Sequence, residues 1–178
     1  ELKAANNKIA SEIKAAEKKY AEQLKQLENN SSNNSSPGGS SSGYFSAPVS
    51  GSVTANAYYS SGKFHGAIDY GVSVGTTVYA AADGVVMSTA NLSGSYGTYV
   101  VIRHANGLQS YYAHGTRGSI VVTPGTTVKK GQKIMLSGNT GNSTGPHMHF
   151  EVRKAPYHYS YSAKNYGQDS RVNPLNYM

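Results

Sequence analysis

The sequence of 178 residues contains no cysteine and no tryptophan, and it has only 9 Asp and Glu against 16 Lys and Arg. The absence of cysteine excludes a disulfide framework, a thiolate nucleophile and any cysteine-based zinc or iron–sulfur site. Any metal must therefore bind to imidazole and carboxylate groups. No segment approaches the roughly 18 consecutive apolar residues that a membrane-spanning helix needs. The length allows one ordinary domain with an appendage.

The residues that are abundant are 20 Gly and 15 Tyr, a composition that favours turns and strands. The formal net charge of +7 is unevenly placed. Residues 1–28 contain 6 Lys and 5 Glu, which leaves 10 Lys and Arg against 4 Asp and Glu, a net charge of +6, for the rest of the chain. Such a charge predicts an anionic partner without identifying it.

Residues 1–28 show the spacing of an amphipathic helix with coiled-coil character. The apolar residues recur three, four or seven positions apart: Leu2, Ile9, Ile13, Ala16, Tyr20 and Leu27. Asn6 and Gln23 occupy seam positions and weaken the pattern, and so short a helix is marginal alone. The segment could bind a coiled-coil partner or self-associate, or it could be a solvated spacer, which is the interpretation that we favour.

Residues 29–43 contain no apolar side chain, so ordering them would have no compensating burial. We predict a flexible linker, and Asn/Ser/Gly spacers of this kind are a compositional hint of a protein that works outside the cytoplasm. The chain begins at Glu1 without an initiator Met or a signal peptide, which predicts that it is cut from a longer protein.

From Tyr44 to Met178 the sequence consists of short β-rich segments separated by Gly and Pro. Strands are predicted over residues 78–80, 84–87, 98–104, 108–114, 119–122 and 147–152. Asn106-Gly107 predicts a hairpin turn, because both residues tolerate positive φ. Two copies of Gly-Thr-Thr-Val, at 75–78 and 125–128, predict two similar hairpin corners. The domain over 44–178 is therefore expected to be mostly antiparallel β, without a helix longer than a turn or two.

Two short motifs place imidazole and carboxylate groups on common faces. His147 and His149 are two residues apart, which puts both on one face of a strand. His65 and Asp69 lie four positions apart in a Gly-containing segment, and because this spacing is even they also point to one side of an extended backbone. His114 adds a third imidazole at the end of a predicted strand.

Two imidazoles and one carboxylate with an open position are typical of a catalytic zinc site, although non-haem iron uses similar ligands. Extra histidines favour zinc hydrolysis, because they can move protons and stabilise an oxyanion. Glu151 shares the strand face of His149 and stays a candidate acid or base. Spacing alone does not separate the roles of His147 and His149, and His104 and His158 are interpreted as structural.

Three segments together resemble the lysostaphin/LytM-type zinc endopeptidases, metallopeptidase family twenty-three, which cleave peptide bonds in bacterial peptidoglycan. They are residues 64–70 (FHGAIDY), residues 112–114 (YAH), and residues 137–151, in which a Gly/Asn/Ser/Thr-rich loop leads into His-x-His. The loop is the most specific of the three. The resemblance covers roughly residues 44–177 and does not extend to the helix or the linker.

The resemblance implies that His65, Asp69 and His149 bind one zinc ion per chain. It also implies that His114 and His147 orient or deprotonate the attacking water and stabilise the tetrahedral intermediate. Many members have Gly two residues after the first His, where this chain has Ala67 after Gly66. Because the ligand spacing is unchanged, we expect only a local backbone difference.

The fold implied by the resemblance is a twisted antiparallel sheet, the duplicated hybrid motif, with the metal at the floor of a groove. The predicted groove walls are residues 56–63, 91–97 and 156–167. The last segment contains four tyrosines, Tyr157, Tyr159, Tyr161 and Tyr166. They either grip a peptide or pack on the outer face of the sheet, and both interpretations stay open.

The leading hypothesis is hydrolysis of a stem-peptide or cross-bridge amide bond by a zinc-activated water. The bond could lie in a Gly-rich bridge, after D-Ala, or in the stem. We expect an extracytoplasmic protein, secreted or attached to the cell surface, encoded by a bacterium or a phage. Its positive charge suits anionic wall polymers as well as peptidoglycan peptides, and no nucleic-acid-binding motif is found.

Two alternatives come from other functional classes. A catalytically silent scaffold or activator of wall remodelling would work through the coiled coil, but such family members typically lose a ligand and this chain retains all five site residues. A lipoyl or biotinyl carrier is suggested by the repeated Gly-Thr-Thr-Val corners. We rank it below, because Lys129 and Lys130 follow a predicted strand and do not mark an obvious hairpin tip.

Overall fold

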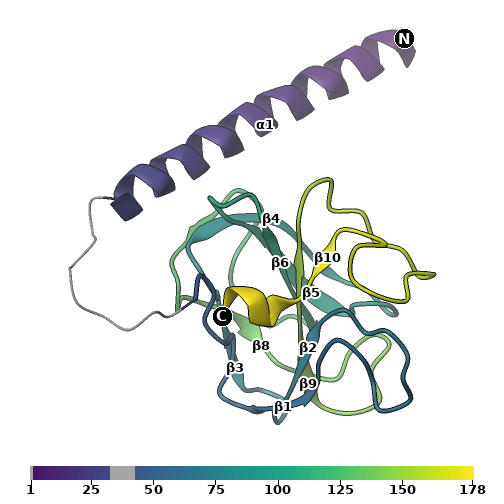
Figure 1. The fold of residues 1–178 in the computed structure, drawn as a ribbon. Coiled ribbons are helices and arrows are strands. Elements are labelled where there is room, and N and C mark those ends of the chain that lie inside the picture. The colour runs from purple at the N-terminus through teal and green to yellow at the C-terminus, as the bar shows by residue number, and fades with distance from the viewer. Residues whose placement is uncertain (1, 33–42) are drawn as a thin grey trace.

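The computed structural model describes residues 2–32 and 43–178. Over these residues one α-helix, α1 (Leu2–Ser32), precedes a domain of ten strands and a C-terminal 3-10 helix, η1 (Pro174–Tyr177) (Figure 1). The prediction of a mostly β domain without a long helix is confirmed for residues 43–178. Within the described part of the chain, no helix combines the length and apolarity that a membrane span requires.

The large sheet contains eight strands, and every neighbouring pair is antiparallel. Its order is β1-β2-β9-β6-β5-β4-β7, and β10 pairs with the end of β9. The bounds are β1 (Ser52–Ala55), β2 (Ile68–Gly71), β4 (Gly84–Asn91), β5 (Thr98–Arg103), β6 (Gln109–Gly115), β7 (Thr127–Val128), β9 (His147–Arg153) and β10 (Arg171–Val172). Consequently β2, β9 and β6 lie side by side.

A second, two-stranded sheet pairs β3 (Thr77–Tyr79) with β8 (Lys133–Leu136). Val78 and Met135 from this sheet join Tyr112 and Phe150 from the large sheet in one buried apolar cluster. This core covers one face of the β9 region and leaves the opposite face for polar side chains. The burial of apolar side chains at alternate positions explains why these short segments form strands.

The repeated Gly-Thr-Thr-Val segments form two matching corners. Gly75 and Gly125 have φ values of 88° and 87°, in the left-handed region that glycine adopts without strain. In the two corners the Thr76 N–H donates to Ser73 O at 3.2 Å and the Thr126 N–H donates to Thr123 O at 3.0 Å. β3 and β7 begin directly after them, so the predicted pair of similar corners is confirmed.

The strand predicted over residues 119–122 is wrong. The segment lies beside β8, but the Val121 N–H to Ile134 O bond is not continued into a ladder of paired residues. Ser119 bonds instead to Thr116 O through its side chain. Pro124 follows shortly after and has no N–H to donate, which is consistent with irregular backbone here.

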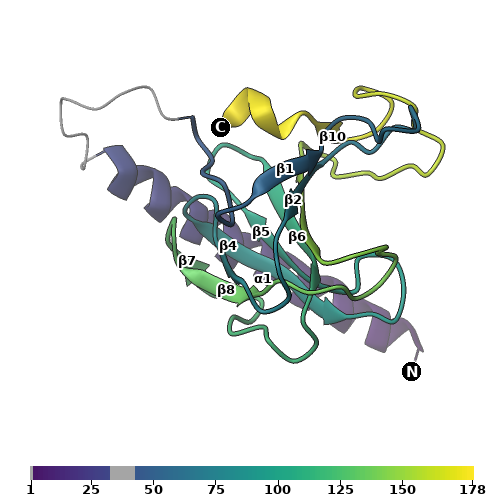
Figure 2. The same ribbon diagram turned by 90° about the horizontal axis from the view of Figure 1, so that it is seen from below.

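The helix α1 contacts the β4 side of the sheet (Figure 2). Leu27 is buried, and the Gln23 side-chain amide donates to Gly125 O at 3.2 Å. These are seam positions of the predicted coiled coil, and here they face the chain's own domain. Coiled-coil association therefore stays a prediction. The helix also continues through Ser32, into the segment predicted as a linker, and residues 33–42 of that segment lie outside the described residues.

Candidate metal centre

Three adjacent strands supply the histidines and the carboxylate singled out from the sequence. Asp69 lies on β2 and is the register partner of His149 on β9. His149 is in turn the register partner of Ala113 on β6, which immediately precedes His114. His65 comes from the loop that enters β2. All five predicted site residues therefore meet at the middle of the sheet, although their chain positions span 65 to 149.

Alternation along β9 assigns its side chains to two faces. Met148 and Phe150 are fully buried in the apolar core. His147, His149 and Glu151 therefore project from the opposite face. The same-face prediction for the His-x-His pair is confirmed, since both imidazoles approach Asp69, His149 Nδ1 at 3.0 Å and His147 Nε2 at 3.7 Å from its Oδ1.

His114 does not follow the alternation of β6. By parity it would share the core-facing side of Tyr112, but its φ is 61°, which is uncommon for a residue with a side chain. The ring instead lies beside His147 and His149, with centroid separations of 4.7 and 5.6 Å. Backbone strain of this kind gathers at functional sites. The positive φ thus brings the fifth residue into the group.

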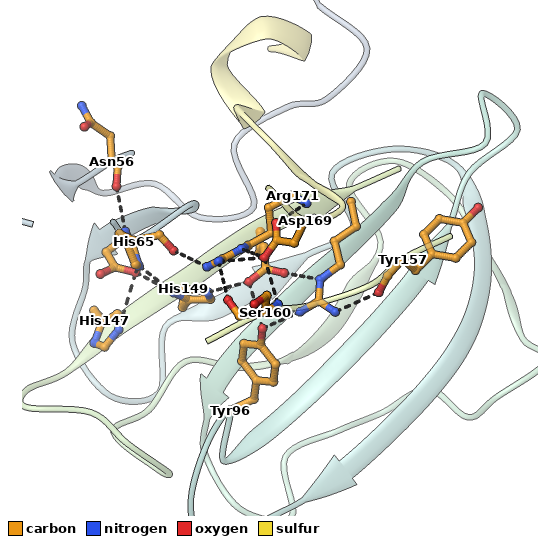
Figure 3. Close-up of polar contacts among 12 residues, drawn as sticks. Asn56, His65, Tyr96, His147, His149, Tyr157, Ser160, Asp169 and Arg171 are labelled. Carbon is orange, nitrogen blue, oxygen red and sulfur yellow. Dashed lines mark hydrogen bonds and ion pairs between the residues drawn. The ribbon is translucent and has the colours of Figure 1, made fainter. Parts of the chain in front are cut away.

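The ligand-type atoms of His65, Asp69 and His149 converge closely, and Figure 3 shows His65 and His149 next to each other. His65 Nε2 lies 3.0 Å from His149 Nδ1 and 3.2 Å from Asp69 Oδ1, and His149 Nδ1 lies 3.0 Å from Asp69 Oδ1. Ligands about 2.0–2.1 Å from a tetrahedral zinc ion are roughly 3.4 Å apart. The three atoms therefore fit one small cation after a slight expansion. His114, His147 and His149 form a second group of atoms within 4.8 Å of one another, which shares His149.

Hydrogen bonds at the remaining ring nitrogens orient three of the imidazoles. His65 Nδ1 lies 2.8 Å from Asn56 O, His114 Nδ1 lies 2.8 Å from Thr140 O, and His147 Nδ1 lies 2.8 Å from Gly145 O. A carbonyl oxygen accepts only from N–H, so each of these Nδ1 atoms carries the proton. The Nε2 lone pairs are thereby left free, an arrangement typical of metal-binding and proton-transferring histidines.

The electrostatic environment of Asp69 favours a cation. Burial would raise the pKa of this carboxyl, but the hydrogen bond from His149 and the nearby His65 ring outweigh burial and lower it. Burial also opposes charge on His149, yet the Asp69 and Glu151 carboxylates raise its pKa. Over the described residues, Asp69 makes ion-pair contacts with imidazoles and none with Lys or Arg. A buried carboxylate without a fixed cationic partner suits a bound metal ion.

His114 has the opposite electrostatic character. Burial, together with the charge on His149, lowers the pKa of His114 to about 4. Its imidazole is therefore neutral at pH 7, with the Nε2 lone pair available to accept a proton.

A cavity of about 700 Å³ opens above these residues. All three predicted wall segments contribute to it, through Tyr59 and Lys63, through Ser95 and Tyr96, and through Tyr159 and residues 161–164. The glycine-rich loop adds Asn142, which the sequence analysis did not assign to a wall. The groove implied by the resemblance is therefore present, with a fourth side.

The four tyrosines of the C-terminal segment divide between the two interpretations. Tyr159 and Tyr161 line the cavity. Tyr166 packs edge-on against Phe64 at a centroid distance of 5.2 Å. The Tyr157 hydroxyl accepts from Arg103 and donates to Gly107 O, away from the cavity. Two tyrosines therefore suit substrate contact and two fix the loop.

Arg171 is a site residue that the sequence analysis missed. Its guanidinium donates to His65 O at 3.0 Å and lies over the rings of Phe64 and Tyr159, 4.6 and 4.5 Å from their centroids. A Cβ on Gly66, which has a φ of 73°, would lie 3.0 Å from Arg171 Cδ. Glycine at this position therefore lets Arg171 approach and support the backbone of His65. A lone arginine near the C-terminus gave no sequence signal for this contact.

Glu151 is fully buried, and its carboxylate accepts from Arg153 Nε and from the Tyr96 hydroxyl. With both oxygens engaged, it is a poor candidate for the acid or base of the reaction. His104 is also fully buried and makes structural hydrogen bonds, as predicted. His158 is exposed and lies outside the cluster.

Known proteins share this domain. An uncharacterized metalloprotease of Haemophilus influenzae is 49% identical over 87 residues, which are 49% of this chain and 18% of the relative. The peptidoglycan DD-endopeptidase ShyA of Vibrio cholerae is 46% identical over 88 residues, 49% of this chain and 20% of the relative. The chain thus spans about a fifth of the length of these curated relatives.

Solved structures agree with the fold. The crystal structure of a zinc containing peptidase from Vibrio cholerae superposes with a TM-score of 0.54 at 33% identity, covering 62% of this chain and 36% of that one. Lysostaphin from Staphylococcus simulans superposes with a TM-score of 0.63 at 24% identity, covering 78% and 54% of the two chains, which shows the shared fold.

The family model described as Peptidase family M23 matches residues 63–174. This range contains all five converging residues and the strands β2, β6 and β9 that position them. The chain therefore belongs to peptidase family M23, as the His-x-x-x-Asp and His-x-His motifs indicated.

Proposed function

We propose that this chain is a zinc-dependent endopeptidase that hydrolyses an amide bond in peptidoglycan peptides. The observation that supports the proposal best is the convergence of three ligand-type atoms, 3.0 to 3.2 Å apart, beside an open cavity that His65 and His149 line. The name of ShyA, a peptidoglycan DD-endopeptidase, supplies the substrate class, and its DD designation favours a bond between D-configured residues over a glycine bridge.

His65 through Nε2, His149 through Nδ1 and Asp69 through a carboxylate oxygen would hold the metal. A zinc ion bound there would act as a Lewis acid on the amide carbonyl and lower the pKa of water to about 7. The choice of zinc follows from the ligand types and from the zinc containing peptidase among the structural neighbours.

His114 and His147 have the geometry for proton transfer. Each Nδ1–H is fixed on a backbone carbonyl, and each Nε2 is free on the side of Asp69 and His149. His114 is neutral at pH 7 because burial lowers its pKa. One imidazole can accept the proton of the water, and the other can donate to the oxyanion or to the leaving amine.

The cavity walls would hold the peptide. Tyr59, Tyr159 and Tyr161 provide rigid amphipathic surfaces on which a short peptide can pack. Lys63 and Lys164 place positive charge at the rim, where stem-peptide carboxylates or anionic wall polymers could bind. Because peptidoglycan lies outside the cytoplasm, we also propose that the chain works there, either secreted or at the cell surface.

The second candidate function is a catalytically silent scaffold. A scaffold of this kind would bind its partner through the coiled-coil seam of α1. The seam residues near the end of α1 pack against the chain's own domain, which leaves them unavailable to a partner in this arrangement. The complete site and the open cavity favour the enzyme.

A clearing assay with purified cell walls tests the proposal. We expect about one zinc per chain and chelator-sensitive clearing, which is lost in Asp69→Ala and in His114→Ala. His158→Ala is the matched control, because His158 is exposed and outside the cluster. Mass spectrometry of the released fragments would identify the bond. Unchanged clearing in Asp69→Ala and His114→Ala would overturn the catalytic assignment.

A further inference from the structure

Glu151, Arg153 and Tyr96 form a polar network beside His149. Glu151 and Arg153 follow His149 on β9, and Tyr96 comes from the loop between β4 and β5. Glu151 is fully buried, and its Oε2 accepts from the Tyr96 hydroxyl at 2.9 Å. Its Oε1 accepts from Arg153 Nε, and Arg153 Nη2 donates to the same Tyr96 hydroxyl at 2.6 Å. The carboxylate is therefore held in place by two other side chains and has little freedom to turn.

The two nitrogens of His149 have different surroundings. Nδ1 faces the proposed metal position, 3.0 Å from both Asp69 Oδ1 and His65 Nε2. Nε2 is buried without a hydrogen-bond partner, and Glu151 Oε2 lies 3.6 Å from it. A shift of about 0.4 Å would bring this pair to the outer limit of ordinary hydrogen-bond length.

We infer that Glu151 is a positioning residue, whose carboxylate accepts the Nε2–H of His149 and thereby keeps the Nδ1 lone pair directed at the metal position. The inference rests on the proposed metal site. It accounts for three observations together: the buried nitrogen without a partner, the buried carboxylate beside it, and the clamp of Arg153 and Tyr96. His65 has its equivalent partner in the carbonyl of Asn56.

The network also extends to the cavity wall. The Arg153 guanidinium lies over the rings of Tyr111 and Tyr159, 4.1 and 5.0 Å from their centroids. Tyr159 lines the cavity. The residue that holds Glu151 therefore also holds part of the wall, and the orientation of His149 is fixed relative to the groove.

Zinc competition against a chromophoric chelator tests the inference, with purified wild-type and variant chains. We expect Glu151→Gln to bind zinc about 10–100-fold more weakly, because the amide no longer provides a fixed acceptor at Nε2. Glu151→Asp should weaken binding similarly, since it keeps the charge beside Arg153 but withdraws the oxygen from His149. If Glu151→Gln does not fold, the zinc affinity of Glu151→Asp is compared with that of wild type instead.

Tyr111→Phe is the matched control, because it keeps the ring beneath Arg153 and removes a hydroxyl that donates to Gln109 and not to Glu151. We expect its zinc affinity to stay within about threefold of wild type. Long-range ¹H–¹⁵N spectra give a second readout, in which the His149 proton should reside on Nε2 in the zinc-bound wild type.

The outcomes separate the inference from the proposed function. Wild-type chain that binds no zinc would overturn both. Wild-type chain that binds zinc, with Glu151→Gln and Glu151→Asp equal to it, would overturn the inference alone. Equal losses in Tyr111→Phe and Glu151→Gln would also overturn it, since the effect would then arise from packing around Arg153 and not from the Glu151 carboxylate.

Discussion

Two histidines buried in the same β domain, His104 and His149, differ in almost every property that chemistry requires. Both ring nitrogens of His104 have partners, Asp83 O at 2.8 Å and Ser110 Oγ at 2.7 Å. Ser110 Oγ lies 2.9 Å from the Tyr112 hydroxyl, which accepts the Ala81 N–H. His149 instead faces an open cavity and has one buried nitrogen without a partner.

The pKa values of the two imidazoles also move in opposite directions. Burial lowers the pKa of His104 to about 4, because the opposing hydrogen bond to Asp83 O and the charge of the Asp83 carboxylate are too weak to offset it. Burial acts on His149 as well, but Asp69 and Glu151 outweigh it and raise its pKa. The comparison teaches that burial alone does not mark a functional histidine. His149 differs from His104 because two carboxylates outweigh burial at its ring and one of its nitrogens lacks a partner.

The largest expected effect concerns His147, which projects from the same face of β9 as His149. His147→Asn should reduce the rate of cross-link hydrolysis by about 10²–10⁴-fold, because it removes a proposed proton-transfer group. Zinc stoichiometry should stay near one per chain, since His147 is not among the three proposed ligands. Initial rates from fragment release and metal analysis of the same sample would check both points. An active His147→Asn would place His147 with His104 among the structural residues.

The next largest expected effect concerns His104, the structural histidine of the pair. His104→Ala should lower the free energy of unfolding by about 2–4 kcal/mol, because it leaves a cavity and removes the partners of Ser110 and Asp83 O. Urea unfolding measures the change. The specific activity of the folded protein should equal wild type. His158→Ala, an exposed histidine, is the control and should change stability by less than about 0.5 kcal/mol.

The smallest effect is a dependence of stability on pH. The pKa of His104 is about 4 in the folded chain, against 6.5 for an unperturbed histidine. As pH falls below 6.5 the unfolded chain binds the proton first, so the His104 contribution to stability is complete above pH 6.5 and is lost as pH falls toward 4. The loss amounts to about 2 kcal/mol at pH 5.

Urea unfolding of wild type and His104→Asn at pH 7 and pH 5 would check this dependence. The variant should show a smaller decrease in stability between the two values. Parallel decreases in the two proteins would show that His104 does not titrate on unfolding, and would weaken the contrast with His149.

Much of the site could be predicted from local spacing. Side chains alternate between the two faces of a strand, so His147 and His149 share one face. The apolar Met148 and Phe150 show that the other face is the buried one. The family resemblance added the roles of the residues. The pairing of Asp69 with His149 depends on the register of β2 against β9, which local sequence does not encode.

Three features could not be predicted, each for a physical reason. The orientation of His114 depends on a left-handed backbone that strand parity contradicts. The support of His65 by Arg171 joins residues 106 positions apart. The seam of α1 satisfies the same heptad pattern whether it packs on a second helix or, as here, on a sheet. Pattern analysis identifies an apolar stripe but not its partner.

Two of the three proposed ligands and the walls of the groove come from different kinds of backbone. Asp69 and His149 belong to paired strands, while residues 159–164 and Asn142 belong to loops. Insertions or deletions in those loops leave the strand register, and hence the spacing of the ligands, unchanged. We expect such a scaffold to diversify its specificity by loop exchange, so that related enzymes can address walls of different composition with one unaltered catalytic floor.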